Sequence, residues 1–252
     1  HTDGWQNTAE EDPAQTEYHI FDSRNKTVNM YTNGQIGERI TYTPSDRLSF
    51  EADGYLYRKR IFRPTNGRHP SCDVNTFDMK YRDAGASLGS EYKLKGTDRI
   101  TLDVSWDRHA YYYHYTDTTL EEGYDPNRNY TPYYPYFPDQ EHLQSDQQRT
   151  MAELKGVFSL PYGNLLSTGA EYRFDYLRAP MRVKGGRADD WTTALYLQDE
   201  YTGVNWLNVT AGIRLIENKA FGFHATPKIS AMFKVADLRI RTGWGRGFKS
   251  LT

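Results

Sequence analysis

Residues 208–248 read NVTAGIRLIENKAFGFHATPKISAMFKVADLRIRTGWGRGF, and three runs within this stretch alternate between apolar and polar side chains. The runs cover residues 208–215, 225–235 and 238–245. Successive side chains of a β-strand point to opposite faces of a sheet, so an apolar residue at every second position predicts a strand with one apolar face. The stretch therefore predicts three consecutive amphipathic strands. The pattern alone leaves open whether their apolar faces meet a protein core or lipid.

The same alternation recurs through the earlier part of the chain. It predicts further strands at residues 27–43, 47–56, 78–94, 100–115, 152–160, 166–176 and 193–201. Short turns follow residues 43, 94, 160, 202 and 235, whereas residues 116–148 and 178–191 form longer loops between hairpins. Residues 16–21 are a possible additional strand. Short turns at one rim and longer loops at the other are typical of outer-membrane β-barrels. The sequence thus predicts an all-β fold, an antiparallel meander of about ten strands forming part of a transmembrane β-barrel.

The apolar faces are predicted to meet lipid. The opposite faces carry Arg, Lys, Asp, Glu and Gly together, which suits a wet or filled interior. Tryptophans lie near predicted strand ends, where interfacial aromatic girdles belong; they are Trp106, Trp191, Trp206 and Trp244. The alternative is a soluble antiparallel sandwich, in which two sheets bury their apolar faces against each other.

Composition excludes several classes of protein. The 252 residues carry 31 Lys and Arg against 33 Asp and Glu, so no positive field attracts nucleic acid. No apolar run approaches the roughly twenty residues of a transmembrane helix. The only cysteine, Cys72, has no partner for an internal disulfide. Aromatic residues make up 15% of the chain, which argues against disorder.

The C-terminal residues 242–252, TGWGRGFKSLT, resemble a segment of TonB-dependent outer-membrane receptors. In that family a glycine-rich strand commonly leads into Gly-Arg-Gly-Phe-Arg/Lys-Ala/Ser-Pro. Three earlier segments also resemble strands of the same family: residues 195–201, 212–214 and 227–230. The similarity therefore covers roughly residues 147–252. Leu251 departs from the pattern, because the family usually has proline there.

The resemblance implies a barrel of about twenty-two strands around an N-terminal plug. Residues 1–252 would then be a segment of one β-barrel domain, and the plug, the TonB box and the remaining strands would lie outside this sequence. Lipid does not tolerate the open edges of an incomplete barrel, which favours this interpretation. The alternative is a complete ten-stranded barrel in which residues 27–43 close against residues 238–248.

The resemblance also implies a function. A receptor of this family would import a scarce nutrient, such as a ferric siderophore, haem or cobalamin, across the outer membrane of a Gram-negative bacterium. No covalent chemistry and no resident cofactor are expected. The implied partners are the nutrient ligand, the TonB complex acting through the plug, outer-membrane lipid and a possible surface lipoprotein.

Candidate ligand-binding residues form two groups. His109, Tyr111 and Tyr113 share the polar face at the loop end of their strand and are expected to point inward. The long loop adds side chains able to cover a flat ligand: Tyr124, Tyr130, Tyr133, Tyr134, Tyr136, Phe137 and His142. His and Tyr can also ligate haem iron. The alternative is that these aromatic residues anchor the barrel in the outer-leaflet interface or pack the loop on itself.

Charged residues suggest two further roles. Asp125, Asn127 and Asn129 place oxygen side chains at alternate positions, as calcium loops do, but no later glutamate follows in register. The calcium assignment stays open, and no metal site is predicted. Inward-facing cations would steer an anionic ligand or pair with acidic groups of the plug or neighbouring strands; they are Arg214, Lys228, Lys234, Arg239 and Arg241.

An enzyme is the competing hypothesis. Ten-stranded outer-membrane proteases use Asp and His at the extracellular rim to activate a water molecule. The chain offers these residue types at Asp103, Asp107, His109, Asp117 and His142. Motifs such as Gly-x-Ser-x-Gly and His-Glu-x-x-His do not occur. The sequence therefore favours a receptor over a self-contained protease.

Overall fold

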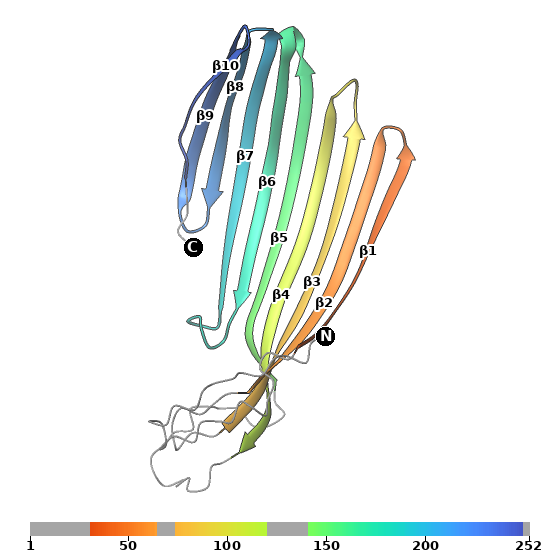
Figure 1. The fold of residues 1–252 in the computed structure, drawn as a ribbon, viewed down its shortest axis with the longest axis vertical. Helices are drawn as coiled ribbons and strands as arrows, with labels where there is room; N and C mark the ends of the chain where they lie inside the picture. The colour runs from red at the N-terminus through yellow and green to blue at the C-terminus, as the bar shows by residue number, and fades with distance from the viewer. Residues whose placement is uncertain (1–30, 65–73, 120–140, 249–252) are drawn as a thin grey trace.

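The computed structural model describes residues 31–64, 74–119 and 141–248, and nearly all of them lie in β-strands (Figure 1). The strands are β1 (Tyr31–Ser45), β2 (Leu48–Pro64), β3 (Val74–Lys93), β4 (Arg99–Thr119), β5 (Glu141–Leu160), β6 (Asn164–Arg178), β7 (Arg187–Val204), β8 (Leu207–Asn218), β9 (Gly222–Val235) and β10 (Leu238–Gly245). A short 3-10 turn, η3 (Pro161–Gly163), joins β5 to β6. The predicted antiparallel meander is confirmed, and the possible strand at 16–21 lies outside the described residues.

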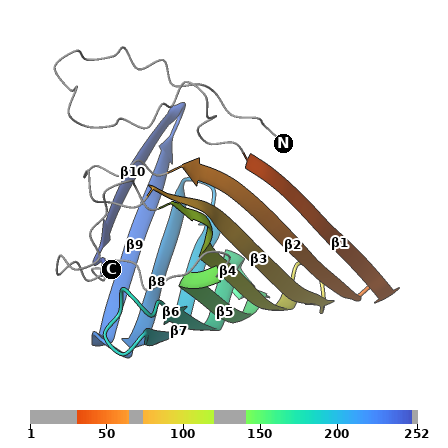
Figure 2. The same cartoon turned by 90° about the horizontal axis from the view of Figure 1, so that it is seen from below.

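The ten strands form one sheet in chain order, each antiparallel to the next. Figure 2 shows that this sheet curves into an open trough, with β1 and β10 as its edges. A sandwich requires two packed sheets, so that alternative is wrong for the described strands. Closure of residues 27–43 against residues 238–248 is also wrong for these strands, because the curvature leaves the two edges apart.

The predicted tight turns all lie at one end of the sheet (Figure 1). In the β3–β4 turn, the backbone N–H of Leu94 donates to the carbonyl of Asp98 at 2.8 Å, and Gly96 has φ +66°. In the β5–β6 turn, Gly163 has φ +81°, and a Cβ there would come within 2.6 Å of the Gly203 Cα. Positive φ and close backbone approach both favour glycine, so these turns set the register of the hairpins they join.

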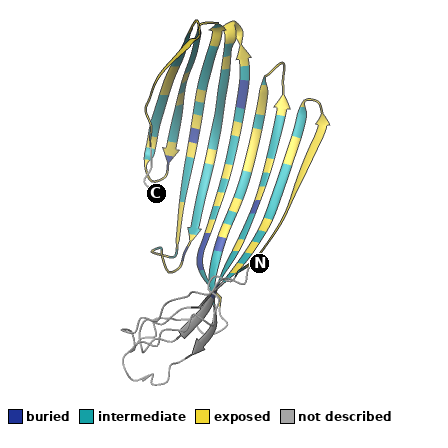
Figure 3. Ribbon diagram, in the orientation of Figure 1, coloured by how far each residue is buried: buried dark blue, intermediate teal, exposed yellow. Residues whose placement is uncertain are grey.

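Side chains separate onto two faces as the alternation predicts. Directly paired residues share a face, and the predicted apolar positions pair with one another, as Leu102 does with Leu154. Apolar side chains on this outward face remain exposed, with Ile40 at 67% and Leu195 at 60% (Figure 3). In the described residues the buried apolar side chains are only Ala110, Val157, Ala179 and Ala194. The outward face therefore meets no protein core within the described sheet, as expected of a lipid-facing surface.

Aromatic rings border the apolar band near the short turns. Tyr42 stacks on Phe50 with ring centroids 6.5 Å apart, and Trp206 stacks on Phe233 at 6.4 Å. Trp206 lies in the β7–β8 turn, as predicted. Trp244 also lies near a strand end as predicted, but at the end of β10 remote from the β9–β10 turn, so it is not part of this border. This border corresponds to an interfacial aromatic girdle.

Several strands extend further toward the loop end than the sequence predicts. Residues 141–148, predicted as loop, form the first part of β5, and residues 187–191 begin β7. Trp106 and Trp191 consequently lie inside strands rather than near strand ends. Beyond the apolar band both faces meet water, so the alternation that identifies a strand disappears although backbone pairing continues.

The connections at the loop end are also less uniform than predicted. The β6–β7 connection is residues 179–186 rather than 178–191, and the β8–β9 connection is only residues 219–221. The Asn218 side-chain oxygen accepts hydrogen bonds from the backbone N–H groups of Ala220 and Phe221 at 2.9 and 3.0 Å. This Asx-type turn makes a long loop unnecessary at that position.

Candidate ligand-binding site

Two hollows of more than 600 Å³ lie along the polar face of the trough, so the polar face is the concave one. The loop-side hollow, about 680 Å³, is lined by residues that include Tyr55, Asp83, Asp107, His109, Arg149 and Asp175. The turn-side hollow, about 660 Å³, lies nearer the short turns, because it takes Thr101 and Asp103 from β4 rather than Asp107 and His109. Together they form a water-facing channel wall.

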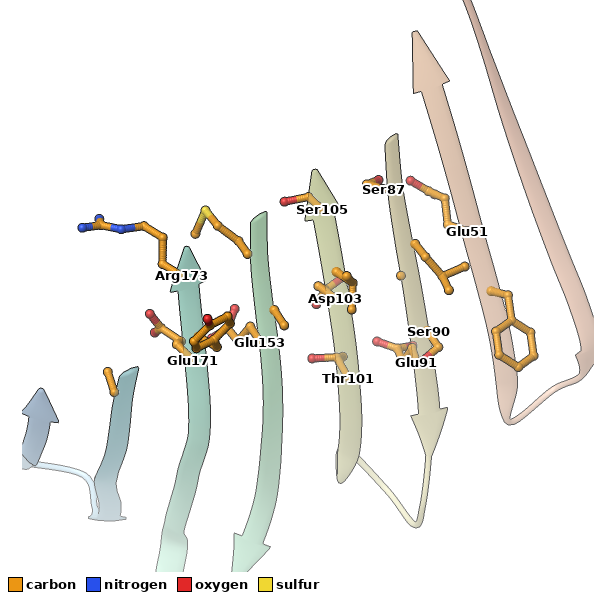
Figure 4. Close-up of a pocket in the computed structure, with 18 of the residues that line it drawn as sticks. Glu51, Ser87, Ser90, Glu91, Thr101, Asp103, Ser105, Glu153, Glu171 and Arg173 are labelled. Atoms are coloured by element: carbon orange, nitrogen blue, oxygen red, sulfur yellow. The ribbon is translucent and has the colours of Figure 1, made fainter. Parts of the chain in front are cut away.

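Acidic side chains dominate the turn-side hollow (Figure 4). The carboxylates come from five neighbouring strands and are Glu51, Glu91, Asp103, Glu153 and Glu171. Arg214 Nη2 donates to Glu171 Oε2 at 2.6 Å, and the Tyr196 hydroxyl donates to Glu153 Oε1 at 2.6 Å. The turn-side hollow is therefore an acidic wall braced by cross-strand hydrogen bonds.

The inward cations divide into paired and unpaired groups. Arg214 pairs with Glu171 of a neighbouring strand, which is one of the roles predicted for it. The four others lie on the polar face of β9 and β10 and, within the described residues, have no ion pair: Lys228, Lys234, Arg239 and Arg241. The polar face is thus acidic toward β2–β6 and basic toward β9 and β10.

Aromatic rings form a ladder on the polar face of β3 and β4 at the loop end. Tyr81 stacks on Tyr111 with centroids 5.9 Å apart, and Tyr111 lies 6.2 Å from Tyr113. The His109 ring lies 5.8 Å from Tyr81. We call Tyr81, His109, Tyr111 and Tyr113 the aromatic ladder. It arises because alternate residues of β4 share a face and the β3–β4 register pairs Tyr81 with Tyr111.

The sheet brings four of the predicted ligand-binding residues close together. His109, Tyr111 and Tyr113 lie on the polar face as predicted, and His142 is registered opposite Tyr113. The placement of His142 in the long loop is wrong, because β5 already begins at Glu141. The remaining predicted residues lie outside the described residues: Tyr133, Tyr134 and Tyr136, with Tyr124, Tyr130 and Phe137, and the candidate calcium residues from Asp125 to Asn129.

Charged groups surround the ladder. His109 Nδ1 lies 2.8 Å from Asp83 Oδ1, and the Tyr55 hydroxyl donates to Asp107 at 3.3 Å. Across the hollow, Arg149 Nε donates to Asp175 Oδ1 at 2.7 Å. Beyond the apolar band, burial lowers the pKa of the His142 imidazole and so favours its uncharged form. The loop-side site therefore combines flat rings, carboxylates and an imidazole.

The sequence prediction missed several residues of this site, among them Tyr81, Asp83 and Arg182. Tyr81 and Asp83 occupy alternate positions on the polar face of β3. The turn after Leu94 sets the β3–β4 register, which places them opposite Tyr111 and His109, so both could have been predicted. Arg182 lies in the β6–β7 connection with its guanidinium carbon 5.5 Å from the centroid of the Tyr111 ring. No periodicity signals this contact, because it depends on how a loop folds over the strands.

The proposed protease residues are only partly assembled. Asp103, Asp107 and His109 share one face of β4, but the carboxylate beside His109 belongs to Asp83 rather than Asp107. The side chain of Asp117 lies outside the described residues, and His142 lies beside Tyr113. Across residues 31–64, 74–119 and 141–248, no group of three or more His, Cys, Asp or Glu is placed to hold a metal ion. No helix in this part of the chain is long and apolar enough to cross a membrane.

Residues 13–252 match the sequence family described as TonB dependent receptor-like, beta-barrel. The fold is also similar to solved structures of siderophore receptors. A ferric enterobactin receptor (PfeA) variant from Pseudomonas aeruginosa aligns with a TM-score of 0.65 and 12% identity, over 94% of this chain and 36% of the receptor. The siderophore receptor PirA from Acinetobacter baumannii gives a TM-score of 0.61 and 12% identity, over 88% and 34%. No curated protein sequence matches the chain.

The open antiparallel sheet, its exposed apolar band and its polar concave face define part of an outer-membrane receptor barrel. The chain belongs to the TonB-dependent receptor β-barrel family, as the resemblance of its C-terminal segment predicts. It spans about a third of the length of the solved receptors to which it is similar, with 34 to 36% of those chains covered.

Proposed function

We propose that these strands form part of the wall of a TonB-dependent receptor that imports a scarce nutrient across the outer membrane of a Gram-negative bacterium. Family membership and the exposed apolar band support this function. The cargo would be a ferric siderophore, haem or cobalamin. The residues of this chain would act as a segment of one barrel domain, whose plug, TonB box and further strands lie outside residues 1–252.

The ligand would bind at the loop-side hollow. The observation that carries this proposal is the aromatic ladder, which stands on the water-facing side of the strands directly beside a hollow of about 680 Å³. Stacked tyrosines offer flat apolar faces with polar hydroxyl tips, which suit aromatic or ring-shaped ligands. Tyr133, Tyr134, Tyr136 and the other aromatic residues of segment 120–140 would cover the ligand from outside.

Energy for release would come from the TonB complex through the plug, and a surface lipoprotein would be an optional ligand donor. No covalent step is proposed. The protease alternative rests on the Asp83–His109 contact at 2.8 Å. That contact lies against the Tyr81 ring within an open sheet, and the self-closed barrel which the alternative requires is not formed by β1 and β10.

The ladder is tested by ligand titration of the intact receptor with ferric enterobactin, haem and cobalamin as separate probes. Replacing Tyr111 with Ala is expected to weaken binding of the cognate probe about tenfold, and Tyr111→Phe to preserve most of it, because stacking supplies the energy. Haem binding would add a Soret shift that is lost in His109→Ala. Tyr92→Ala, on the outward face, is the matched control.

Equal affinity of wild type and Tyr111→Ala for the bound probe would contradict the ladder as the binding site. Failure of every probe to bind the wild type would contradict the proposed cargo classes. Cleavage of added peptides that is abolished by His109→Ala would favour the protease alternative.

A further inference from the structure

A group of cations lies on the outward face of β2, β3 and β4, directly beyond the apolar band. The same step from apolar to basic occurs on all three strands: Leu56 is followed by Arg58, Ala84 is preceded by Arg82, and Trp106 is followed by Arg108. Arg60 and Lys80 form the next row. We call Arg58, Arg60, Lys80, Arg82 and Arg108 the outward basic block.

The register places like charges directly opposite one another. Arg58 pairs with Arg82, and Arg60 pairs with Lys80. Like charges at directly opposed positions destabilise a sheet. A further opposed pair, Arg178 with Arg187, occupies the outward face at the loop end of β6 and β7. Such an arrangement requires compensating negative charge close by.

The acidic groups nearby neutralise the block only in part. Asp78 pairs with Arg60, Asp146 pairs with Arg108, and Glu141 is shared between Lys80 at 2.6 Å and Arg82 at 2.5 Å. Three carboxylates therefore face five cations. Within the described strands, Arg58 has no carboxylate partner and is exposed. The block keeps a positive surplus on the side of the barrel wall that faces away from the water-filled trough.

The position of the block along the strand matches a lipid headgroup. From Leu48 to Leu56, β2 rises about 26 Å at roughly 3.3 Å per residue. A tilt of about 40° reduces this to about 20 Å, which is comparable to the roughly 25 Å height of an outer-membrane apolar band. The block begins at the next outward position. Because longer loops of such barrels lie outside the cell, this level is that of the outer leaflet.

Within the block, a ring contact orients the Arg82 side chain. The Arg82 guanidinium carbon lies 4.5 Å from the centroid of the Tyr112 ring, and this stacking orients its planar group. Arginine offers paired N–H donors whose geometry matches phosphate oxygens. Arg82 and Arg58 remain exposed, with 44% of the Arg82 side chain accessible.

We propose that the outward basic block docks the phosphate groups of an acylated lipid in the outer leaflet, while the lipid's chains lie along the apolar band beneath it. The occupant is a membrane lipid rather than a transported nutrient, because the block and the aromatic ladder lie on opposite faces of the same strands. The site is independent of which cargo the receptor imports. Through this site, the outward face of β2, β3 and β4 would bind a particular class of membrane lipid.

Native mass spectrometry of the intact receptor in detergent tests this proposal, with dioleoyl phosphatidic acid as the probe and dioleoylglycerol as its phosphate-free match. Phosphatidic acid is expected to bind and dioleoylglycerol to bind far more weakly. Each removed cation should weaken binding about fivefold, so Arg58→Gln with Arg82→Gln should weaken it about 25-fold. The pair of Lys substitutions at the same positions should retain most of the affinity, because the charge is kept.

The control variant carries Arg239→Gln and Arg241→Gln on the polar face of β10, and should bind phosphatidic acid as the wild type does. Unchanged binding by the Arg58 and Arg82 double variant, or equal binding of dioleoylglycerol, would overturn the proposal. Displacement of the lipid by inorganic phosphate at equimolar concentration would also overturn it, since that result describes a site for the free ion. Thermal unfolding of each variant verifies that the barrel is intact.

Discussion

The two ends of β7 differ in what their faces meet. In residues 193–201, outward Leu195 and Leu197 are exposed at 60% and 47%, whereas the intervening residues line the polar trough. In residues 187–191, nearer the loops, charged side chains occupy both faces, with Arg187 and Asp189 on one and Asp190 on the other. The backbone pairs with β6 equally at both ends. Strand pairing is therefore independent of the membrane, whereas side-chain alternation records where one face meets lipid and the other water.

A charge placed in the apolar band should have the largest effect. Leu195→Arg is expected to lower the free energy of unfolding by about 2–4 kcal/mol, because the guanidinium would face hydrocarbon. Gln198→Arg lies on the polar face of the same strand and should cost less than about 1 kcal/mol. Urea unfolding of the intact receptor in lipid vesicles measures both. An equal loss of unfolding free energy in the two variants would show that the two faces do not meet different environments.

The second largest effect on stability should come from close packing around Gly169 on the polar face. A Cβ at Gly169 would come within 2.4 Å of the Tyr196 hydroxyl and 2.6 Å of the Leu154 carbonyl oxygen. Gly169→Ala is therefore expected to destabilise the barrel by about 1–3 kcal/mol through overpacking. Gly34→Ala, where nothing lies within 4 Å, should be close to neutral. If Gly34→Ala costs as much in the same unfolding measurement, packing against Tyr196 is not the cause.

Ion pairs on the polar face should contribute less. Arg214→Gln removes the bidentate ion pair with Glu171, and we expect it to lower the free energy of unfolding by about 1 kcal/mol. Arg149→Gln, at the loop end, removes a pair whose arginine side chain is 55% exposed, so it should cost about 0.5 kcal/mol or less. A larger cost at Arg149 than at Arg214 would reverse the expected order along the trough.

The smallest effect concerns pH at the loop end, outside the apolar band. The hydrogen bond from Lys80, with a further one from Arg82, lowers the pKa of Glu141 below its ordinary value. A lowered folded-state pKa stabilises the protein above the unfolded value of about 4.3, and this stability is lost as pH falls through the folded value. Glu141→Gln should remove this pH-dependent part, which amounts to less than about 0.5 kcal/mol. Unfolding measured as a function of pH tests this. If the stability of Glu141→Gln falls at acid pH as much as that of the wild type, Glu141 is not the group responsible.

Sequence alone predicted the parts of the fold in which one face meets lipid. The strands containing Leu102, Leu154 and Leu195, their face assignment and the tight turns all follow from period-two alternation and turn residues. It did not predict residues 141–148 as strand, because Gln144, Asp146 and Gln148 supply no contrast between faces.

The candidate site was predictable to the same extent. Alternation along β4 predicts that His109, Tyr111 and Tyr113 share the polar face. The register set by the β3–β4 turn would have added Tyr81 and Asp83. The placement of His142 beside Tyr113 required the extended start of β5. Contacts made by a connection, such as Arg182 over Tyr111, have no local signal, since they depend on the folding of the connection over the sheet.

The central claim is that the outward face meets lipid along the apolar band while the polar face lines water. Nitroxide labels attached to single cysteines at residues 187–201 of the intact receptor test it, by collision rates with oxygen and with a water-soluble nickel chelate. Labels at 195 and 197 should favour oxygen, labels at 196 and 198 should favour nickel, and labels at 187–190 should favour nickel throughout. Equal nickel accessibility at 195, 196, 197 and 198 would contradict a lipid-facing wall.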